Sequence, residues 1–338
     1  MKIAVDAMGG DFAPREVVKG SLQAAMEYGI SVILVGDEKQ VLAELDKADT
    51  GGLVSVVHAS EVIGMGEQPA VAVRRKRDSS IVRATQLVKD GEASAVVSAG
   101  NTGAAMASAL IYLGRIKGID RPAIAGLLPN EKSFSLMLDV GANVDSKPTN
   151  LLQFGIMGYQ YAKKIMSIDN PRVGLLSNGE ETTKGNETTL AAFPQLQSAG
   201  INFIGNVEGR DIFSGGVDVI VCDGFIGNIV LKAGEGMAVM LLKMIKEEIT
   251  KSWLAKSGAV LAKPALKALQ KRLDYNEYGG APFLGVNGVS IICHGSSTAK
   301  AVKSAIKLAR DSVDNYLVEE IGASMVNMES REAGGSIE

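Results

Sequence analysis

The strongest constraint on the fold is a series of nine short apolar runs distributed along the 338-residue chain. In order, they read KIAVD, SVILVG, LVSVVH, ASAVVS, AIAGLLP, SFSLMLD, RVGLLS, VDVIVCD and VSIICH. Their apolar residues are continuous instead of alternating with polar ones, which is typical of strands covered by helices on both faces. The runs therefore predict a sheet buried between two helical layers.

Helical stretches separate several of these runs. They include PREVVKGSLQAAMEYG, SSIVRATQLVKDG, TNLLQFGIMGYQYAKKI and STAKAVKSAIKLARDSVDNYLVEE. This alternation predicts an α/β fold with a doubly wound, largely parallel sheet. Because no linker-like block divides the chain, we expect one compact α/β domain over residues 1–338, built as one or two lobes. The polar, glycine-containing tail 326–338 is expected to be frayed.

The composition argues against several classes of protein. The formal net charge of −3 is unlike that of a general nucleic-acid binder, which needs positive charge to neutralise phosphates. Cys222 and Cys293 are far apart in the sequence, so we expect neither a disulfide framework nor a thiolate metal site. We expect that no apolar stretch reaches the roughly 18 residues of a membrane span. The N-terminus begins with a strand and not a signal peptide, so we expect a soluble, intracellular protein.

Residues 225–280 form an unusually long connection. They join two predicted strands, and the connection has more residues than a crossover helix requires. GNIVLKAGEGMAVMLLKMIKEEITKSW resembles a long helix, and Pro264 is placed to open a second one. We therefore expect a helical hairpin that protrudes from the domain. Between Lys251 and Leu273 there are six basic residues and no acidic one. Four apolar residues interleave with these cations: Trp253, Leu254, Val260 and Leu261.

This pattern suits a membrane surface or a docking groove for a negatively charged partner. A dimer interface with a solvated rim explains it equally well, and the two interpretations are compatible.

Polar, glycine-containing turns follow several predicted strands. Ligands of open α/β sheets bind at the carboxyl ends of strands, so these turns are candidate binding elements. SAGNTGA and CHGSSTA each combine glycine, hydroxyl groups and a following helix N-terminus, which suits an anion such as phosphate. Any one such turn is more often a helix cap than a site. The candidate residues are Asp6, Gly9, Gly10, Asp11, Gly100, Asn101, Thr102, Gly103, Lys184, Asp223, Asn228, His294, Gly295, Ser296 and Ser297.

Several catalytic signatures are missing. The sequence has no dinucleotide fingerprint, no Walker loop and no GxSxG elbow. With no evident protein nucleophile, direct transfer between two bound substrates is the natural inference. SAGNTGA is similar to the SGNTG loop of fold-type-II pyridoxal-phosphate enzymes, in which Lys76 would mimic the Schiff-base lysine. The second glycine-rich loop of those enzymes has no counterpart here, so this remains the alternative enzyme hypothesis.

A second resemblance covers nearly the whole chain. VDAMGGD, PAVAVRRK, SAGNTGA, GIDRPA, DVGAN, GEETTKGNE, GNVEGRDI, DGFIGNIVLK, YGGAPFLGV and HGSSTAKA occur in this order. Together they resemble the phosphate acyltransferase (PlsX) family of bacterial phospholipid synthesis. The resemblance implies transfer of a fatty acyl group from acyl carrier protein to inorganic phosphate, which gives acyl phosphate. It also implies a fold similar to phosphotransacetylase and isocitrate dehydrogenase, a homodimer, and peripheral contact with the inner face of the membrane.

In such a reaction phosphate is itself the nucleophile, so the protein needs an anion-binding turn and donors for the developing oxyanion. Lys184 and Asn228 are the candidate catalytic residues, and the turns at Gly100–Gly103 and Gly295–Thr298 are the candidate phosphate-binding elements. No cofactor or metal is required. Arg74, Arg75, Lys76 and Arg77 are candidates for binding the acidic carrier protein, although a solvated charged face explains them equally well. The alternative hypothesis without catalysis is a scaffold protein that binds carrier protein or membrane.

Overall fold

The computed structural model describes residues 1–46, 50–273 and 279–334. Its centre is an 11-stranded sheet with the strand order β3-β2-β1-β4-β11-β10-β5-β6-β9-β7-β8. The strands are β1 (Lys2–Asp6), β2 (Ser31–Gly36), β3 (Val54–His58), β4 (Ala95–Ser98), β5 (Ala123–Pro129), β6 (Phe134–Leu138), β7 (Val173–Leu176), β8 (Phe203–Val207), β9 (Val219–Val221), β10 (Ala281–Leu284) and β11 (Val289–Ile292).

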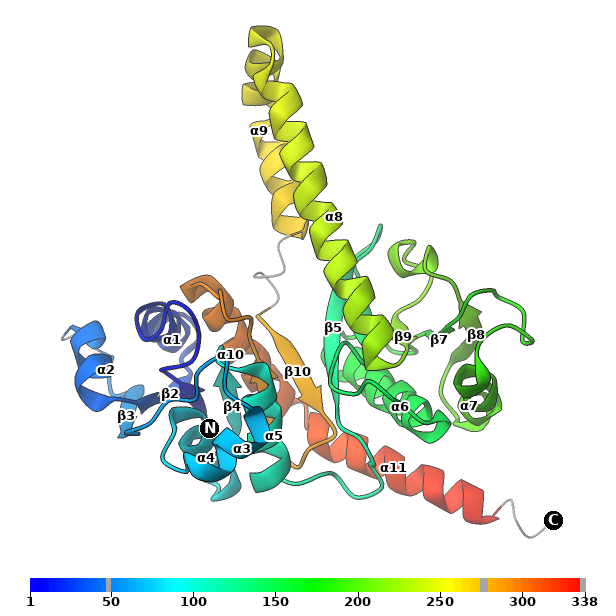
Figure 1. Cartoon of the computed structure of the whole chain (residues 1–338), viewed down its shortest axis with the longest axis horizontal. Helices are drawn as coiled ribbons and strands as arrows, with labels where there is room; N and C mark the ends of the chain where they lie inside the picture. The colour runs from blue at the N-terminus through cyan, green and yellow to red at the C-terminus, as the bar shows by residue number, and fades with distance from the viewer. Residues whose placement is uncertain (47–49, 274–278, 335–338) are drawn as a thin grey trace.

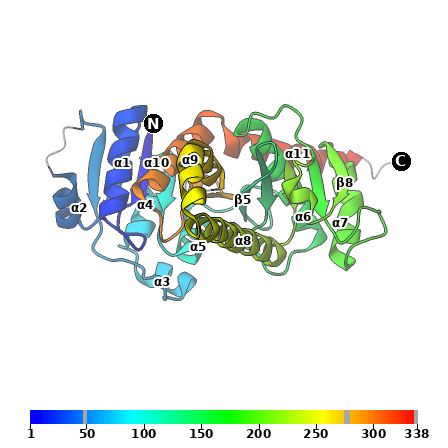
Figure 2. The ribbon, with the colours of Figure 1, turned by 90° about the horizontal axis from the view of Figure 1, so that it is seen from above.

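Helices cover the sheet on both faces, and a pair of helices projects from it (Figures 1 and 2). Together, the helices are α1 (Arg15–Tyr28), α2 (Glu38–Leu45), α3 (Pro69–Arg75), α4 (Ser80–Lys89), α5 (Thr102–Tyr112), α6 (Pro148–Lys164), α7 (Glu187–Ser198), α8 (Gly224–Thr250), α9 (Trp253–Leu273), α10 (Ala299–Asp314) and α11 (Leu317–Gly334). A short 3₁₀ turn spans Asp211–Phe213. The predicted α/β class with helices on both faces is confirmed.

Two parallel sets of strands make up the sheet. The first contains β3, β2, β1, β4 and β11, and the second contains β6, β9, β7 and β8. Between them, β10 pairs antiparallel with β11 and with β5, and β5 pairs antiparallel with β6. The sheet is therefore largely parallel, as predicted, but its second set runs in the opposite sense to its first. Figure 1 shows the two sets as the left and right halves of the molecule.

Two strands were not expected from the sequence. β10 begins directly after Gly279 and Gly280, and it contains Pro282, so its composition does not indicate a strand. β8 is interrupted by Gly205, whose φ of 99° is unfavourable for other residues. Both strands form because the sheet supplies a neighbour, and β10 makes the connection between the two halves.

Buried apolar side chains form three clusters. One lies around β1, β2 and α1 in the first half and includes Leu34, and another surrounds α6 in the second half and includes Phe154. The third cluster contains residues of both halves, among them Ile33, Ile220 and Phe283. The two halves therefore share both a sheet and part of a hydrophobic core.

α8 and α9 form a hairpin that projects away from the sheet (Figure 1), and Figure 2 shows it from its far end. The sequence placed the end of the first helix at Trp253 and the start of the second at Pro264, and both placements are wrong. Ser252 caps α9, since its Oγ accepts a hydrogen bond from the Ala255 amide at 3.3 Å. α8 therefore ends at Thr250, and Pro264 lies inside α9.

α8 also corrects the expectation that no segment is long and apolar enough for a membrane span. Among the described residues α8 is long and apolar enough to cross a membrane by length and composition alone, and only 6% of its most apolar 18-residue window is buried. Isolated charges such as Lys232 and Glu235 hide this property from a search for uninterrupted apolar runs.

The C-terminal helical stretch also differs from its prediction. It divides into α10 and α11 at Tyr316, which has a left-handed φ of 54°. α11 then continues to Gly334, so residues 326–334 are helical and not frayed, whereas residues 335–338 lie outside the described part of the chain. Met325 is fully buried, and Met328 packs against the core cluster of the second half, which holds this helix against the body.

Candidate active site

The structure groups the candidate residues into two sets at strand ends. The first set follows β1, β4 and β11, which are neighbours in the sheet. Its loops approach each other closely, because a Cβ on Gly9 would lie 2.7 Å from the Gly100 nitrogen. The Asp11 amide donates a hydrogen bond to the Gly295 carbonyl at 2.8 Å. Glycines at these positions therefore allow three strand-end loops to meet.

Asp6 lies at the centre of the first set and is buried. Its carboxylate accepts hydrogen bonds from the Ser98 hydroxyl at 2.7 Å and from the Met8 amide at 3.3 Å. Burial raises the pKa of Asp6, and hydrogen bonds from Ser80 and Ser98 oppose that effect only in part. Asp6 thus joins the ends of β1 and β4 and organises the turn that begins at Ser98.

Asn101 has a structural role in this turn. Its Oδ1 accepts a hydrogen bond from the Ala104 amide at 3.0 Å, which caps α5. Its Nδ2 donates to the carbonyls of Gly64 at 3.2 Å and Met65 at 3.1 Å, which fastens the loop before α3. The side chain predicted to bind phosphate is therefore already engaged with the protein.

Gly103 and Thr102 occupy different environments. A Cβ on Gly103 would lie 2.5 Å from the Pro69 ring, so this glycine allows α5 to pack against α3. Thr102 is exposed, and its hydroxyl remains a candidate ligand group.

The turn after β11 is less open to an anion than its sequence suggests. His294 Nδ1 lies 2.7 Å from the Ser296 hydroxyl, and the Ser297 amide donates to the His294 carbonyl at 3.0 Å. The Ala299 amide, at the N-terminus of α10, donates to the Glu16 carboxylate at 2.8 Å. The protein's own carboxylate thus occupies part of the helix terminus predicted to hold phosphate.

The second set follows β6, β9 and β7, which are also neighbours in the sheet. Asp139, directly after β6, is fully buried and was not singled out from the sequence. Its carboxylate accepts hydrogen bonds from the amides of Ile124 at 3.1 Å, Ala142 at 3.0 Å and Asn143 at 2.7 Å. Burial raises its pKa, and these hydrogen bonds counteract the increase. The motif DVGAN, a carboxylate with glycine and asparagine after an apolar run, was the signal available for finding it.

Asp223 and Asn228 stand at the start of α8. Asp223 is a helix cap, because its Oδ1 accepts hydrogen bonds from the amides of Phe225 at 2.9 Å and Ile226 at 3.0 Å. Asn228 is exposed one turn further on. A Cβ on Gly141 would lie 3.6 Å from the Asn228 Cβ, so Asn228 lies beside the loop that Asp139 organises.

Lys184 belongs to the loop between β7 and α7. Its amide donates to the Glu181 carbonyl at 3.0 Å, and its side-chain stem lies close to Gly179. Lys184 is exposed, and within the described residues no hydrogen bond or ion pair of its ammonium is seen. β7 and β9 are adjacent and parallel, so the loop that carries Lys184 and the start of α8 that carries Asn228 leave the same edge of the sheet.

Neither cysteine is suited to act as a nucleophile. Both are buried. Burial raises the pKa of Cys222 well above its ordinary value, and burial raises the pKa of Cys293 to about 12. Because the thiolate is the reactive form, both side chains are inert near neutral pH.

The four consecutive cations at the end of α3 divide into two kinds. Arg74, Arg75 and Arg77 are exposed. Lys76 is half-buried, and its Nζ contacts the Glu67 carboxylate at 2.7 Å and the Val62 carbonyl at 2.8 Å. Lys76 therefore fixes the loop before α3, a structural role that differs from the expected carrier-protein or Schiff-base contact.

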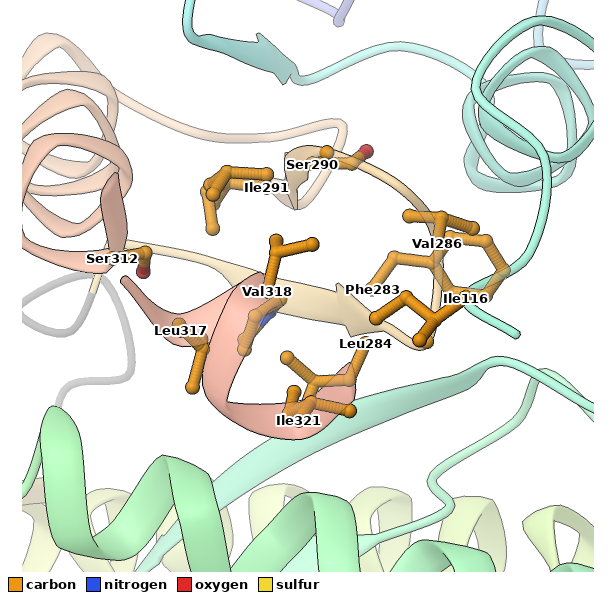
Figure 3. Close-up of a pocket in the computed structure, with 14 residues that line it drawn as sticks. Ile116, Phe283, Leu284, Val286, Ser290, Ile291, Ser312, Leu317, Val318 and Ile321 are labelled. Atoms are coloured by element: carbon orange, nitrogen blue, oxygen red, sulfur yellow. The ribbon is translucent and has the colours of Figure 1, made fainter. Parts of the chain in front are cut away.

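The pocket in Figure 3 does not belong to either set. It lies between β10, β11 and α11, its lining is mostly apolar, and its volume is about 10 Å³, close to that of a single water site. Within the described residues, no three His, Cys, Asp or Glu side chains are grouped so that they could hold a metal ion.

Comparison with solved structures defines the class of fold. A phosphotransacetylase from Streptococcus pyogenes superposes with a TM-score of 0.64 at 17% identity, covering 93% of this chain and 94% of that one. A 4-hydroxythreonine-4-phosphate dehydrogenase from Klebsiella pneumoniae superposes with a TM-score of 0.54 at 15% identity, covering 93% and 98% of the two chains. The fold is therefore the α/β fold of the phosphotransacetylases.

Sequence comparison then gives the family. The model of the fatty acid synthesis protein family matches residues 1–319. A phosphate acyltransferase of Pelotomaculum thermopropionicum is 70% identical over 337 residues, which is 100% of this chain and 98% of the relative. The phosphate acyltransferase of Heliobacterium modesticaldum is 58% identical over 323 residues, 95% of this chain and 96% of the relative. The chain therefore belongs to the phosphate acyltransferase family and is an acyltransferase. This family membership replaces the alternative hypothesis that the chain is a pyridoxal-phosphate enzyme.

Proposed function

We propose that this enzyme transfers a fatty acyl group from the thioester of acyl carrier protein to inorganic phosphate. A phosphate oxygen attacks the thioester carbonyl carbon, a tetrahedral oxyanion forms, and the carbon–sulfur bond then breaks. The products are acyl phosphate and the carrier thiolate, which takes up a proton. The observation that best supports direct attack is the state of Cys222 and Cys293, since burial keeps both thiols protonated.

Lys184 and Asn228 are proposed to act on the charge that develops during attack. An ammonium attracts both the phosphate and the oxyanion, and an amide donates a hydrogen bond without titrating. Their exposure and their position at one edge of the sheet support this role. Asp139 positions the loop beside Asn228 and does not itself contact substrate in this proposal.

The first set of loops is the candidate for phosphate binding, because Thr102 presents an exposed hydroxyl there. The Gly100 amide donates to Ser98 Oγ at 3.1 Å and the Ser296 hydroxyl lies 2.7 Å from His294 Nδ1, so both groups shape the turns. Asp6 holds these loops together through Ser98. Asn101 and the α10 terminus contribute by shaping the loops, because their polar groups are already bonded. Because the strands of the two sets run in opposite senses, direct attack requires the bound phosphate to reach Lys184 and Asn228 across the junction of the two halves.

The remaining partners are proposed from exposed surfaces. The exposed guanidinium groups of Arg74, Arg75 and Arg77 would meet the acidic carrier protein. At the tip of the hairpin, Trp253, Leu254, Val260 and Leu261 are 74%, 64%, 70% and 85% exposed. We propose that this tip contacts an anionic membrane from the cytoplasmic side and that the stem of the hairpin pairs two copies of the chain.

The reaction is tested by mixing purified protein with long-chain acyl carrier protein and measuring free thiol. Thiol should appear only when phosphate is present, in equal amount to acyl phosphate. Iodoacetamide added to the free enzyme beforehand should leave the rate unchanged, because neither cysteine presents a thiolate. Thiol release without phosphate, or a stable acyl-enzyme, would contradict direct attack. Binding of the carrier with no thiol release at all would contradict acyl carrier protein as the acyl donor.

A further inference from the structure

A cavity of about 300 Å³ lies at the opposite ends of the strands that carry the second set of candidate residues. It opens beside Phe134, the first residue of β6, and beside Arg172 and Asp218, which directly precede β7 and β9. Asp139 follows the other end of β6. Five strand residues at about 3.3 Å each separate the cavity from that site by roughly 16 Å. The cavity is therefore distinct from the second set of candidate residues, which includes Lys184 and Asn228.

The cavity is lined by both apolar and charged side chains. The apolar residues, called the apolar wall below, are Leu127, Phe134, Met166 and Ile168. The charged residues are Lys132, Arg172 and Asp218, which gives the lining one positive charge in excess, and Asn130, Ser133 and Gly215 complete it. A lining that combines apolar side chains with a few charged groups is typical of a site for an amphipathic small molecule.

Arg172 is held in a fixed orientation. Its Nε and Nη2 each donate to a different oxygen of Asp218 at 2.9 Å, and Nη2 also donates to the Gly215 carbonyl at 3.1 Å. Burial raises the pKa of Asp218, but hydrogen bonds and charge from Arg172 outweigh burial, so this pKa is lowered and the pair stays ionised. Within the described residues Nη1 makes no hydrogen bond. Arg172 is thus preorganised and retains a donor group.

Lys132 supplies the excess charge. A Cβ on Gly215 would lie 3.0 Å from Lys132 Cγ and 3.1 Å from its Cδ, so the lysine stem rests on this glycine. Gly215 has a φ of 69° and cannot easily be replaced by a residue that would displace the lysine. Within the described residues the ammonium makes no direct hydrogen bond or ion pair, but its charge joins that of Arg172 in lowering the pKa of Asp218. Two cations therefore share one carboxylate, which leaves one positive charge to attract a bound monoanion.

We propose that this cavity binds an amphipathic monoanion, with its carboxylate or phosphate at Lys132 and Arg172 and its hydrocarbon chain on the apolar wall. A volume of about 300 Å³ is roughly 20 to 30 times that of a single water site of about 10–15 Å³, so the cavity is large enough for a small organic ligand. The ligand class is thus an aliphatic carboxylate or alkyl phosphate, and octanoate and octyl phosphate are suitable probes for it.

The test is calorimetric titration of the full-length protein with octanoate, octyl phosphate and inorganic phosphate. Octanoate or octyl phosphate should bind with one site per chain, and the tighter of the two identifies the headgroup. Lys132→Glu, which reverses the charge, should weaken binding at least tenfold. Met166→Trp, which fills the apolar wall, should do the same without changing the charge.

Lys163→Glu is the matched control, because Lys163 is exposed on α6 and does not line the cavity. It should bind octanoate like the unmodified protein, and all three variants should unfold at a similar temperature. Inorganic phosphate binding alone would overturn the proposal, since the apolar wall would then have no function. Octanoate binding that persists in both cavity variants but disappears in Asn228→Ala would also overturn it, by placing the ligand at the reaction centre.

Discussion

At the residue scale, the chemistry of this chain depends on which polar side chains are already bonded within the protein. Asp139, Asp223 and Asn101 each satisfy backbone groups, so they shape loops. Lys184 and Asn228 are exposed at the same sheet edge and have polar groups available to a substrate. The catalytic roles that we propose therefore fall on the second kind of residue.

Lys184→Ala and Asn228→Ala should each lower kcat by about 10² to 10³, the usual cost of losing one oxyanion donor. Steady-state rates of thiol release at saturating phosphate and acyl carrier protein measure this loss. Lys163→Ala is the control for removing an exposed lysine elsewhere and should retain the full rate. Near-normal kcat in both site variants would remove them from the catalytic machinery.

Asp6 gives a prediction about pH and stability. Because burial raises its pKa, the folded protein holds this proton more tightly than the unfolded chain, whose aspartate pKa is about 4. The contribution of Asp6 to the free energy of unfolding is therefore full below that value and declines as pH rises toward the folded pKa.

Asp6→Asn removes the titration and should abolish this decline. The measurement is urea unfolding of both proteins from pH 4 to pH 8. The difference in unfolding free energy between variant and unmodified protein should shift in favour of the variant as pH rises. A difference that is constant across this range would show that the folded pKa of Asp6 is close to its ordinary value.

At the element scale, the hairpin of α8 and α9 has more exposed apolar surface than the helices that cover the sheet. Phe225, Met237, Val239 and Met244 on α8 are all more than half exposed. Exposed apolar side chains in this number on one helix are typical of an interface with another protein or a membrane. The tip adds exposed lysines, so the stem and the tip suit different partners.

Replacing both Leu254 and Val260 with Glu should abolish binding to anionic vesicles while solution activity and dimerisation persist. The apolar side chains contribute insertion, and each lysine near the surface contributes about 1 kcal/mol. Vesicle co-sedimentation and size-exclusion chromatography measure the two properties. The matched control is Ser257→Glu with Ala262→Glu, which adds the same charge at exposed positions and should retain part of the binding. Dissociation into monomers would instead assign the tip to the subunit interface.

At the scale of the whole molecule, one sheet and one shared apolar cluster connect the two halves. Phe283 lies on β10 at this junction, is 3% exposed, and pairs in register with Ile124 of β5. Loss of packing here should therefore affect both halves together.

Phe283→Ala should lower the free energy of unfolding by about 3–5 kcal/mol, the usual cost of removing a buried phenylalanine side chain. Hydrogen exchange followed by mass spectrometry should show reduced protection in β4 and in β6 alike. Leu34→Ala, inside the first half, provides the comparison for a buried residue away from the junction. Reduced protection confined to one half in the Phe283 variant would mean that the halves unfold independently.

The sequence by itself determined the fold class, nine of the strands and the family. These features depend on continuous apolar runs, helical periodicity and ordered motifs, which are local properties of the chain. The turns after β4, β9 and β11 were also visible, because glycine and capping residues mark them.

Tertiary structure decided which of those polar groups remain available. Glu16 reaches the amide of Ala299, 283 residues away, and Asn101 bonds to carbonyls more than 30 residues upstream, so neither contact is marked by local sequence. The local sequence does not mark β10 either. This short segment contains Pro282 and becomes a strand only because it pairs with β11 on one side and β5 on the other. The Lys132 and Arg172 cavity likewise forms from loops that are separate in the chain. Burial and long-range hydrogen bonding act between distant segments, and only the folded chain brings those segments together.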